Sequence, residues 1–247
     1  MRVMLLVVPA FVLASACSAG ERRAAGDGGE GAADGPRAER SFEVGAFRSV
    51  ALTGASDVDI RVGGAPAVRA EGPREALDEL DVRVENGTLR IGTRRDGWFR
   101  TSRGMGEVTV HVTVPALEGA SISGSGDIRI DRAEADSFDA SISGSGDLEI
   151  GALRAGETRF AIAGAGNIHA AGTARRTRVS IAGSGDARLG DLQTGDAEVR
   201  VMGSGNVRLR ATGEVRGRIM GSGDVHVTGT TRCSVSTMGS GDLHCAS

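Results

Sequence analysis

Acidic and amide side chains recur at one position of a repeated turn, where their oxygens could bind a cation. The fourth residues of the seven Gly-Ser-Gly-Asp turns or their variants are Asp127, Asp147, Asn167, Asp186, Asn206, Asp224 and Asp242. Gly-Gly-x-Gly-x-Asp repeats bind calcium, but with a nine-residue period that sets two turns across each ion. Here the period is 18 to 20 residues, so half of such a cage is missing. The pattern allows weak cation sites and favours a turn role, because Asp and Asn commonly bond to turn backbone.

The last two repeats place a set of metal-ligand types close together. "DVH" and "DLH" contain Asp224, His226, Asp242 and His244, and two imidazoles with two carboxylates are a set that zinc accepts. In the other repeats, the position of these histidines is filled by Arg129, Glu149, His169, Arg188 and Arg208. The alternative is therefore a pair of exposed histidines in a surface lattice of ion pairs.

Three cysteines offer two further kinds of chemistry. Cys233 lies six residues before Gly239 and Cys245 six after it, at offsets that hold apolar residues in earlier repeats. We expect both side chains to point inward and to form a disulfide, as an exported chain meets an oxidising compartment. The alternative is two buried free thiols that act as small apolar groups. Cys17 follows "LASA", which resembles a bacterial lipidation motif, with Ala14 where such motifs usually carry Leu.

Other familiar catalytic and binding patterns are missing from the sequence. The chain has no Tyr and no Lys, and the seven turn serines have no assignable base. The glycine spacing does not continue into a dinucleotide-binding motif, and no helix follows it. A formal net charge of −3 argues against a nucleic-acid partner. We therefore expect a protein that is not an enzyme and needs no cofactor.

The residues around each turn must form the elements that position these groups. Apolar side chains alternate with polar ones on both sides of the turn, and the same residue type returns at the same offset in successive repeats. Stacked coils align equivalent positions, which hairpins do not. The sequence thus predicts a parallel β-helix, a single-stranded solenoid of about 18–20 residues per coil with Gly-Ser-Gly-Asp corners. Glycine would allow positive φ at the corner.

Seven such coils are expected over residues 119–247, after irregular coils over 41–118. Residues 50–62 fit a degenerate coil, with Gly54 and Asp57 at the motif offsets, and "PREALDELDV" (73–82) has the spacing of one helical turn. Trp98 and Phe99 lie in a loop with several arginines. They could form a binding tip, or cover the open end of the core.

The first forty residues predict export and anchoring. Residues 1–16 have one Arg, an apolar run and then small residues, as in a signal peptide. We expect Cys17 to be lipidated and residues 17–40, rich in Gly, Ala and charge, to be a flexible tether to the domain at 41–247. Plain secretion after Ala16 is the alternative.

The repeated "SGSGD" turns, with "VENGTLRIGT" (84–93) and "VTVHVTVPALEGASISGSG" (108–126), resemble the autotransporter-adhesin head GIN domain family. The resemblance implies a right-handed β-helix in an exported, often lipid-anchored bacterial protein. We expect an adhesin-like interaction or structural module of the cell envelope, at the outer membrane or cell surface. Its partners would be the membrane, through the lipid, and an envelope protein or polysaccharide. The alternative function is binding of a divalent cation or a polysaccharide.

Overall fold

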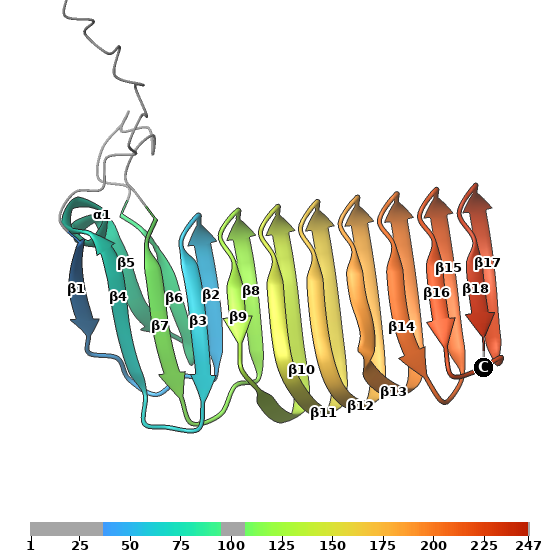
Figure 1. Ribbon diagram of the computed structural model, residues 1–247, viewed down its shortest axis with the longest axis horizontal. Coiled ribbons are helices and arrows are strands. Elements are labelled where there is room, and N and C mark those ends of the chain that lie inside the picture. Colours follow the sequence, from blue (N-terminus) through green and yellow to red (C-terminus); the bar gives the residue numbers. More distant parts are fainter. Residues whose placement is uncertain (1–36, 95–106, 247) are drawn as a thin grey trace, which may run out of the picture. The chain divides into compact units, whose positions relative to one another are not determined.

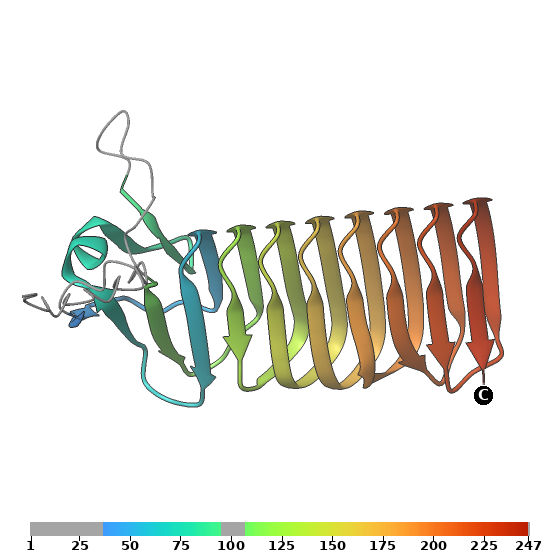
Figure 2. The same ribbon diagram turned by 45° about the horizontal axis from the view of Figure 1, so that its top comes forward.

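The computed structural model describes residues 37–94 and 107–246, which form a parallel β-helix, as predicted (Figures 1 and 2). The strands of its regular stack are β2 (Ser49–Gly54), β3 (Asp57–Val62), β8 (Gly119–Gly124), β9 (Ile128–Ile130), β10 (Ala133–Gly144), β11 (Leu148–Gly164), β12 (Ile168–Gly183), β13 (Ala187–Gly203), β14 (Val207–Ala211), β15 (Val215–Gly221), β16 (Val225–Thr228), β17 (Cys233–Gly239) and β18 (Leu243–Ala246). In the described part of the chain, no helix has the length and apolar character needed to cross a bilayer.

Each coil of the stack has one sharp corner between two sheets, which is a Gly-x-Gly turn in the seven regular repeats and Gly54-Ala55-Ser56 in the first coil. The pre-corner sheet contains the strands that end at this turn: β2, β8, β10, the last parts of β11 to β13, β15 and β17. The post-corner sheet contains those that follow it: β3, β9, the first parts of β11 to β13, β14, β16 and β18. Neighbouring coils pair in parallel, so equivalent residues form columns along the stack.

Both glycines of the corner are required, for different reasons. The first has positive φ in every repeat, for example +136° at Gly183, which confirms the predicted need for glycine. The second has no such φ, but a Cβ at Gly185 would collide with the carbonyl oxygen of Gly166 in the preceding coil. Close approach of stacked backbones, rather than conformation, fixes the second glycine.

Alternation places the predicted apolar columns inside the coil. Ile122, Ile142, Ile162, Ile181 and Val201 pair in register and are each at most 2% exposed. A buried polar group lies in the same core: the hydroxyl of Thr158 donates to that of its register partner Thr177 at 3.0 Å, and Thr177 donates to Thr194 at 2.9 Å. This threonine group was not apparent from the sequence, because its residues lie in the less regular bend opposite the corner.

The N-terminal part closes one end of this core. Its elements are β1 (Arg37–Phe42), β4 (Ala67–Pro73), α1 (Arg74–Glu79), β5 (Leu80–Glu85), β6 (Thr88–Thr93) and β7 (Thr109–Val114). β6 and β7 pair in parallel with β2 and β3, while β4 and β5 add antiparallel strands outside them. The predicted helical turn is α1; Leu77 within it and Leu80 directly after it are buried.

The order of the N-terminal strands differs from the expected run of irregular coils. Residues 50–62 do form a coil at the motif offsets, because Gly54 pairs with Gly124. However, β6 and β7 lie on the other side of this coil although they follow it in the chain. The expected tether is also wrong at its last residues: Arg37 to Arg40 belong to β1, which pairs antiparallel with β4. Arg40 further donates to the carbonyl of Leu77 at 3.0 Å.

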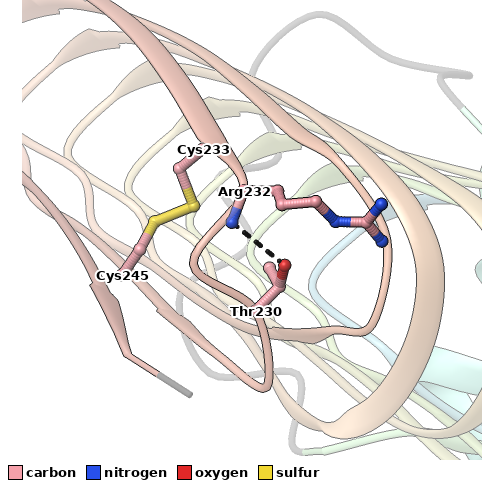
Figure 3. Close-up of a disulfide and its surroundings, with 4 residues drawn as sticks. All are labelled: Thr230, Arg232, Cys233 and Cys245. Atoms are coloured by element: carbon pink, nitrogen blue, oxygen red, sulfur yellow. Dashed lines mark hydrogen bonds between the residues drawn. A yellow bond between two sulfur atoms is a disulfide. The ribbon is translucent and has the colours of Figure 1, made fainter.

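The C-terminal coil leaves its end of the core partly open. Leu243 is only partly buried there, whereas its counterpart Val225 is fully buried, and Val235 is also only partly buried. The structure joins Cys233 to Cys245 by a disulfide across this end, with their Cα atoms 6.7 Å apart (Figure 3). Among the described residues, no strand pairs with the outer edges of β17 and β18.

Candidate binding surface

The Asp and Asn residues of the corners form a column, which we call the Asx column. In each coil the backbone N–H of the column residue donates to the side-chain Oδ1 of its counterpart in the preceding coil. Examples are Asp147 to Asp127 at 2.8 Å and Asn206 to Asp186 at 3.0 Å. The side chains thus bond to the neighbouring coil rather than to their own turn, which corrects the expected turn cap. The column begins at Asp57, whose Oδ1 accepts the N–H of Asp127 at 3.2 Å.

The hydrogen bonds of the Asx column occupy oxygen atoms that a cation would need as ligands. The Oδ1 atom of each member from Asp57 to Asp224 accepts a backbone hydrogen bond. Within residues 37–94 and 107–246, no group of three or more His, Cys, Asp or Glu side chains is arranged to hold a metal ion. Asp224, His226, Asp242 and His244 do lie close together, as their spacing suggests. The rings of His226 and His244 are 6.1 Å apart, and Asp224 accepts the N–H of Asp242.

A row of polar side chains crosses the outer face of the post-corner sheet, two residues beyond the Asx column. We call it the histidine row because it contains all four histidines of the chain. In register, from the capped end to the open end, its members are Ser41, Arg69, His111, Asp59, Arg129, Glu149, His169, Arg188, Arg208, His226 and His244.

Charge is distributed unevenly along the histidine row. Near the capped end, acids alternate with bases: His111 Nδ1 lies 3.5 Å from Asp59, and His169 Nδ1 lies 4.0 Å from Glu149. From Arg188 to the open end the row contains only Arg and His. Arg188 lies 3.6 Å from Asp186 of the neighbouring Asx column, so an anionic partner would compete with that carboxylate for Arg188.

The sequence pattern identified only part of this row. The seven positions in the regular repeats follow from the period, but Asp59, Arg69 and His111 come from the irregular N-terminal region. Asp59 could have been placed, because it follows Asp57 by the same two residues that separate Arg129 from Asp127. Arg69 and His111 could not, since β4 and β7 join the sheet out of chain order.

Ion pairs between coils cover the outer face of the pre-corner sheet. Arg176 contacts Glu157 at 2.8 Å, and Arg178 Nε donates to Glu198 at 2.9 Å. The hydrogen bond from Arg178 holds the pKa of Glu198 below its ordinary value, with Arg200 and Arg216 adding favourable charge. The sequence suggested a lattice on the other face, between the Asx column and the histidine row, where Arg129 lies 3.8 Å from Asp127 and Arg188 lies 3.6 Å from Asp186. The ion pairs of the pre-corner sheet are a second set that the sequence did not indicate.

The bend opposite the corner contains a shallow depression of about 650 Å³. It is lined by charged residues of both signs from several coils: Arg48, Glu118, Glu134, Asp136, Arg154 and Arg175. It brings together no base and nucleophile of the kind that hydrolases use, and it would suit a polar ligand. The sequence did not indicate this site.

Several predicted sites lie outside the described residues. These are the signal peptide at 1–16, Cys17, and Trp98 with Phe99. Lipidation of Cys17 stays a prediction. The Cys233–Cys245 pairing also stays a prediction for the exported protein, although the structure contains that bridge.

A capped parallel β-helix with charged rows on its faces defines the class of this protein: a β-solenoid with an extended polar surface. Residues 46–231 match the family model described as "Putative auto-transporter adhesin, head GIN domain", and the chain belongs to this family. The match covers the first coil, most of the capping elements and nearly all of the stack. It confirms the family resemblance seen in the sequence.

Solved structures share this fold at low sequence identity. A putative adhesin from Bacteroides fragilis superposes with a TM-score of 0.78 at 22% identity, covering 85% of this chain and 97% of its own. A putative lipid binding protein from Parabacteroides distasonis gives 0.69 at 22%, covering 85% and 96%. A putative adhesin from Parabacteroides merdae gives 0.67 at 15%, also covering 85% and 96%. No curated protein sequence matches the chain.

Proposed function

We propose that this protein is an exported, lipid-anchored interaction module of the bacterial cell envelope that catalyses no reaction. The observation that carries the proposal is the histidine row. It presents polar and charged side chains on one strand after another along the sheet, instead of gathering them at one site. Extended repetitive surfaces of solenoids are used for binding. The adhesin descriptions of the family and of its structural relatives support the same role.

The proposed partner is an anionic polymer of the envelope, either an acidic protein or a polysaccharide, bound along the section from Arg188 to His244. Both arginines in this section are exposed. Surface arginines interact with carboxylates and phosphates through paired donors. The B. fragilis and P. merdae proteins are described only as adhesins, so the nature of the polymer has to come from experiment.

A pair of charge-reversal variants tests this surface. Arg188→Glu combined with Arg208→Glu should reduce binding of the purified protein to isolated envelope fractions at least tenfold. The matched control is Arg154→Glu with Arg175→Glu, which reverses two exposed arginines at the depression instead. Equal binding by the row variant and the unchanged protein would refute the proposal. Loss of binding only in the control would move the site to the depression.

Treating the fractions with protease or with glycan-degrading enzymes before the assay identifies the polymer. Protease sensitivity would indicate a protein partner, and sensitivity to glycan degradation a polysaccharide. Binding that survives both treatments would contradict both partners named here.

The anchor is tested separately by cell fractionation. If Cys17 carries the lipid, Cys17→Ala should move the protein from the membrane fraction to the soluble fraction, because a lipid chain supplies most of the membrane affinity. A protein that is soluble with and without the substitution would show ordinary secretion. The P. distasonis relative is described as lipid binding, so detergent-free vesicles should be assayed with the Cys17→Ala protein to separate anchoring from lipid recognition.

A further inference from the structure

Three methionines form a column on the outer face of the pre-corner sheet. Met202 pairs with Met220, and Met220 with Met238, in consecutive coils directly before the corner. Their exposed fractions are 57%, 40% and 67%, and they are the exposed large apolar side chains of the described residues. All other large apolar side chains there are at least partly buried. The column is thus an exception to the way in which this protein places apolar groups.

The choice of residue type indicates that sulfur matters at these positions. In the five preceding coils the same column holds Thr53, Ser123, Ser143, Ala163 and Ala182. A merely apolar contact would accept Ile, Val or Leu, which this chain uses throughout its core and which favour strands. Instead all three positions carry Met. Thioether sulfur is polarizable, and it is a ligand for soft metal ions.

The geometry allows the three sulfurs to approach a single ion. Paired residues on neighbouring strands are about 4.8 Å apart, and Met has three rotatable side-chain bonds, so the outer two can lean toward Met220. Two of the flanking arginines on the same face are already engaged: Arg200 with Glu198 and Arg216 with Glu214. The ligands would therefore be neutral thioethers, with one nearby positive charge, that of Arg218, two residues before Met220.

We propose that Met202, Met220 and Met238 form a binding site for a soft monovalent cation, Cu(I) or Ag(I). Uncharged thioethers match such ions better than they match calcium or zinc, which prefer oxygen or imidazole and thiolate. The site is distinct from the Asx column and from the histidine row, and it is independent of the proposed partner.

The test is titration with Ag(I), which needs no reductant and so leaves the Cys233–Cys245 bridge oxidised. The exported protein carrying Cys17→Ser, which removes the proposed lipid anchor and leaves no free thiol at that position, is labelled with ¹³C at the methionine methyl groups. We expect one Ag(I) per chain and displaced methyl resonances for Met202, Met220 and Met238. Met105, elsewhere in the chain, is the internal control and should not shift with them.

Leucine variants keep the apolar volume and remove the sulfur. Replacing all three methionines by Leu should abolish the stoichiometric binding. Met220→Leu alone should weaken it at least tenfold, and more than Met202→Leu or Met238→Leu, because Met220 lies between the other two in the column. Removing the nearby positive charge with Arg218→Gln should strengthen binding about two- to threefold.

A second control addresses the other soft ligands on the surface. His226→Asn with His244→Asn should leave Ag(I) affinity unchanged. The proposal is overturned if the triple leucine variant binds as well as the unchanged methionine column, if Met105 shifts as much as the three, or if the histidine variant loses the site. It is also overturned if no methyl resonance moves at a stoichiometric ion concentration.

Discussion

At the scale of single residues, the stacking of coils restricts the residue type at the corner more than the conformation of the turn does. A Gly-x-Gly corner could be built in one coil with a small side chain at its second glycine, since that residue has no unusual φ. In the stack, the carbonyl of the preceding coil occupies the place of any Cβ. The sequence shows that both glycines recur, but the reason for the second appears only when neighbouring coils are in place.

Substituting Gly185 by Ala should destabilise the protein by about 1–3 kcal/mol, because the new methyl group would overpack the corner. Chemical denaturation measures this difference. Gly190→Ala, in the same coil, is the matched control: nothing lies within 4 Å of the position that a Cβ would take there, so we expect no loss of stability. Equal effects of the two substitutions would contradict the stacking explanation.

At the scale of elements, the Asx column and the cross-coil ion pairs hold neighbouring strands in register. Each Asx side chain supplies an acceptor to the next coil's backbone, beside the ordinary strand ladder. The ion pairs also connect neighbouring coils, through contacts between their side chains. Both devices repeat with the coil, so loss of one contact should act mainly on the two coils that share it.

Asp186→Ala should reduce the free energy of unfolding by about 1 kcal/mol, because the N–H of Asn206 loses its acceptor. Asp186→Asn keeps an acceptor oxygen and should be close to neutral. Asp242→Ala is the control from the last coil, since its Oδ1 accepts no such bond from a further coil among the described residues. A loss of stability in Asp242→Ala equal to that in Asp186→Ala would argue against the column.

Glu198 should make stability depend on acid pH. Its pKa is lowered in the folded protein by the Arg178 hydrogen bond, so its stabilising contribution is present above the ordinary pKa of 4.5 and is lost as the pH falls through the lower folded value. Glu198→Gln should therefore be less stable at pH 7, with a difference that vanishes in acid. Unfolding curves of Glu198→Gln and of the unchanged protein at a series of pH values measure this difference.

At the scale of the whole molecule, regularity determined how much the sequence could predict. From Gly119 onward one period repeats, so the coil, its corners and its inward columns follow from alternation alone. Residues 63 to 118 have no period, and their strands join the sheet out of chain order. The histidine row was therefore only partly predictable. The methionine column is regular and could have been recognised from the three Met-Gly-Ser-Gly sequences.

The two ends of the molecule are stabilised differently, by a folded cap at one and a disulfide at the other. Cys233→Ser with Cys245→Ser should lower stability by about 2 to 3 kcal/mol on the chain-entropy model, and mainly affect the last coil. Mass spectrometry of the non-reduced exported protein should find the two cysteines in one linked peptide. Full alkylation of both thiols without a reductant would rule the bridge out.

Residues 63–118 separate the first coil from the next coil of the stack along the sequence, and this separation affects how the chain folds. Neighbouring coils in the regular stack join residues 18 to 20 positions apart, for example 20 in the bond from Asp147 to Asp127, whereas the bond from Asp127 to Asp57 spans 70. Closing the longer loop costs about 1 kcal/mol more in chain entropy. Folding should thus begin among the later coils, where contacts are local. The first coil, although it is synthesised earlier, would wait for residues 119–130 before it could pair with the next coil of the stack.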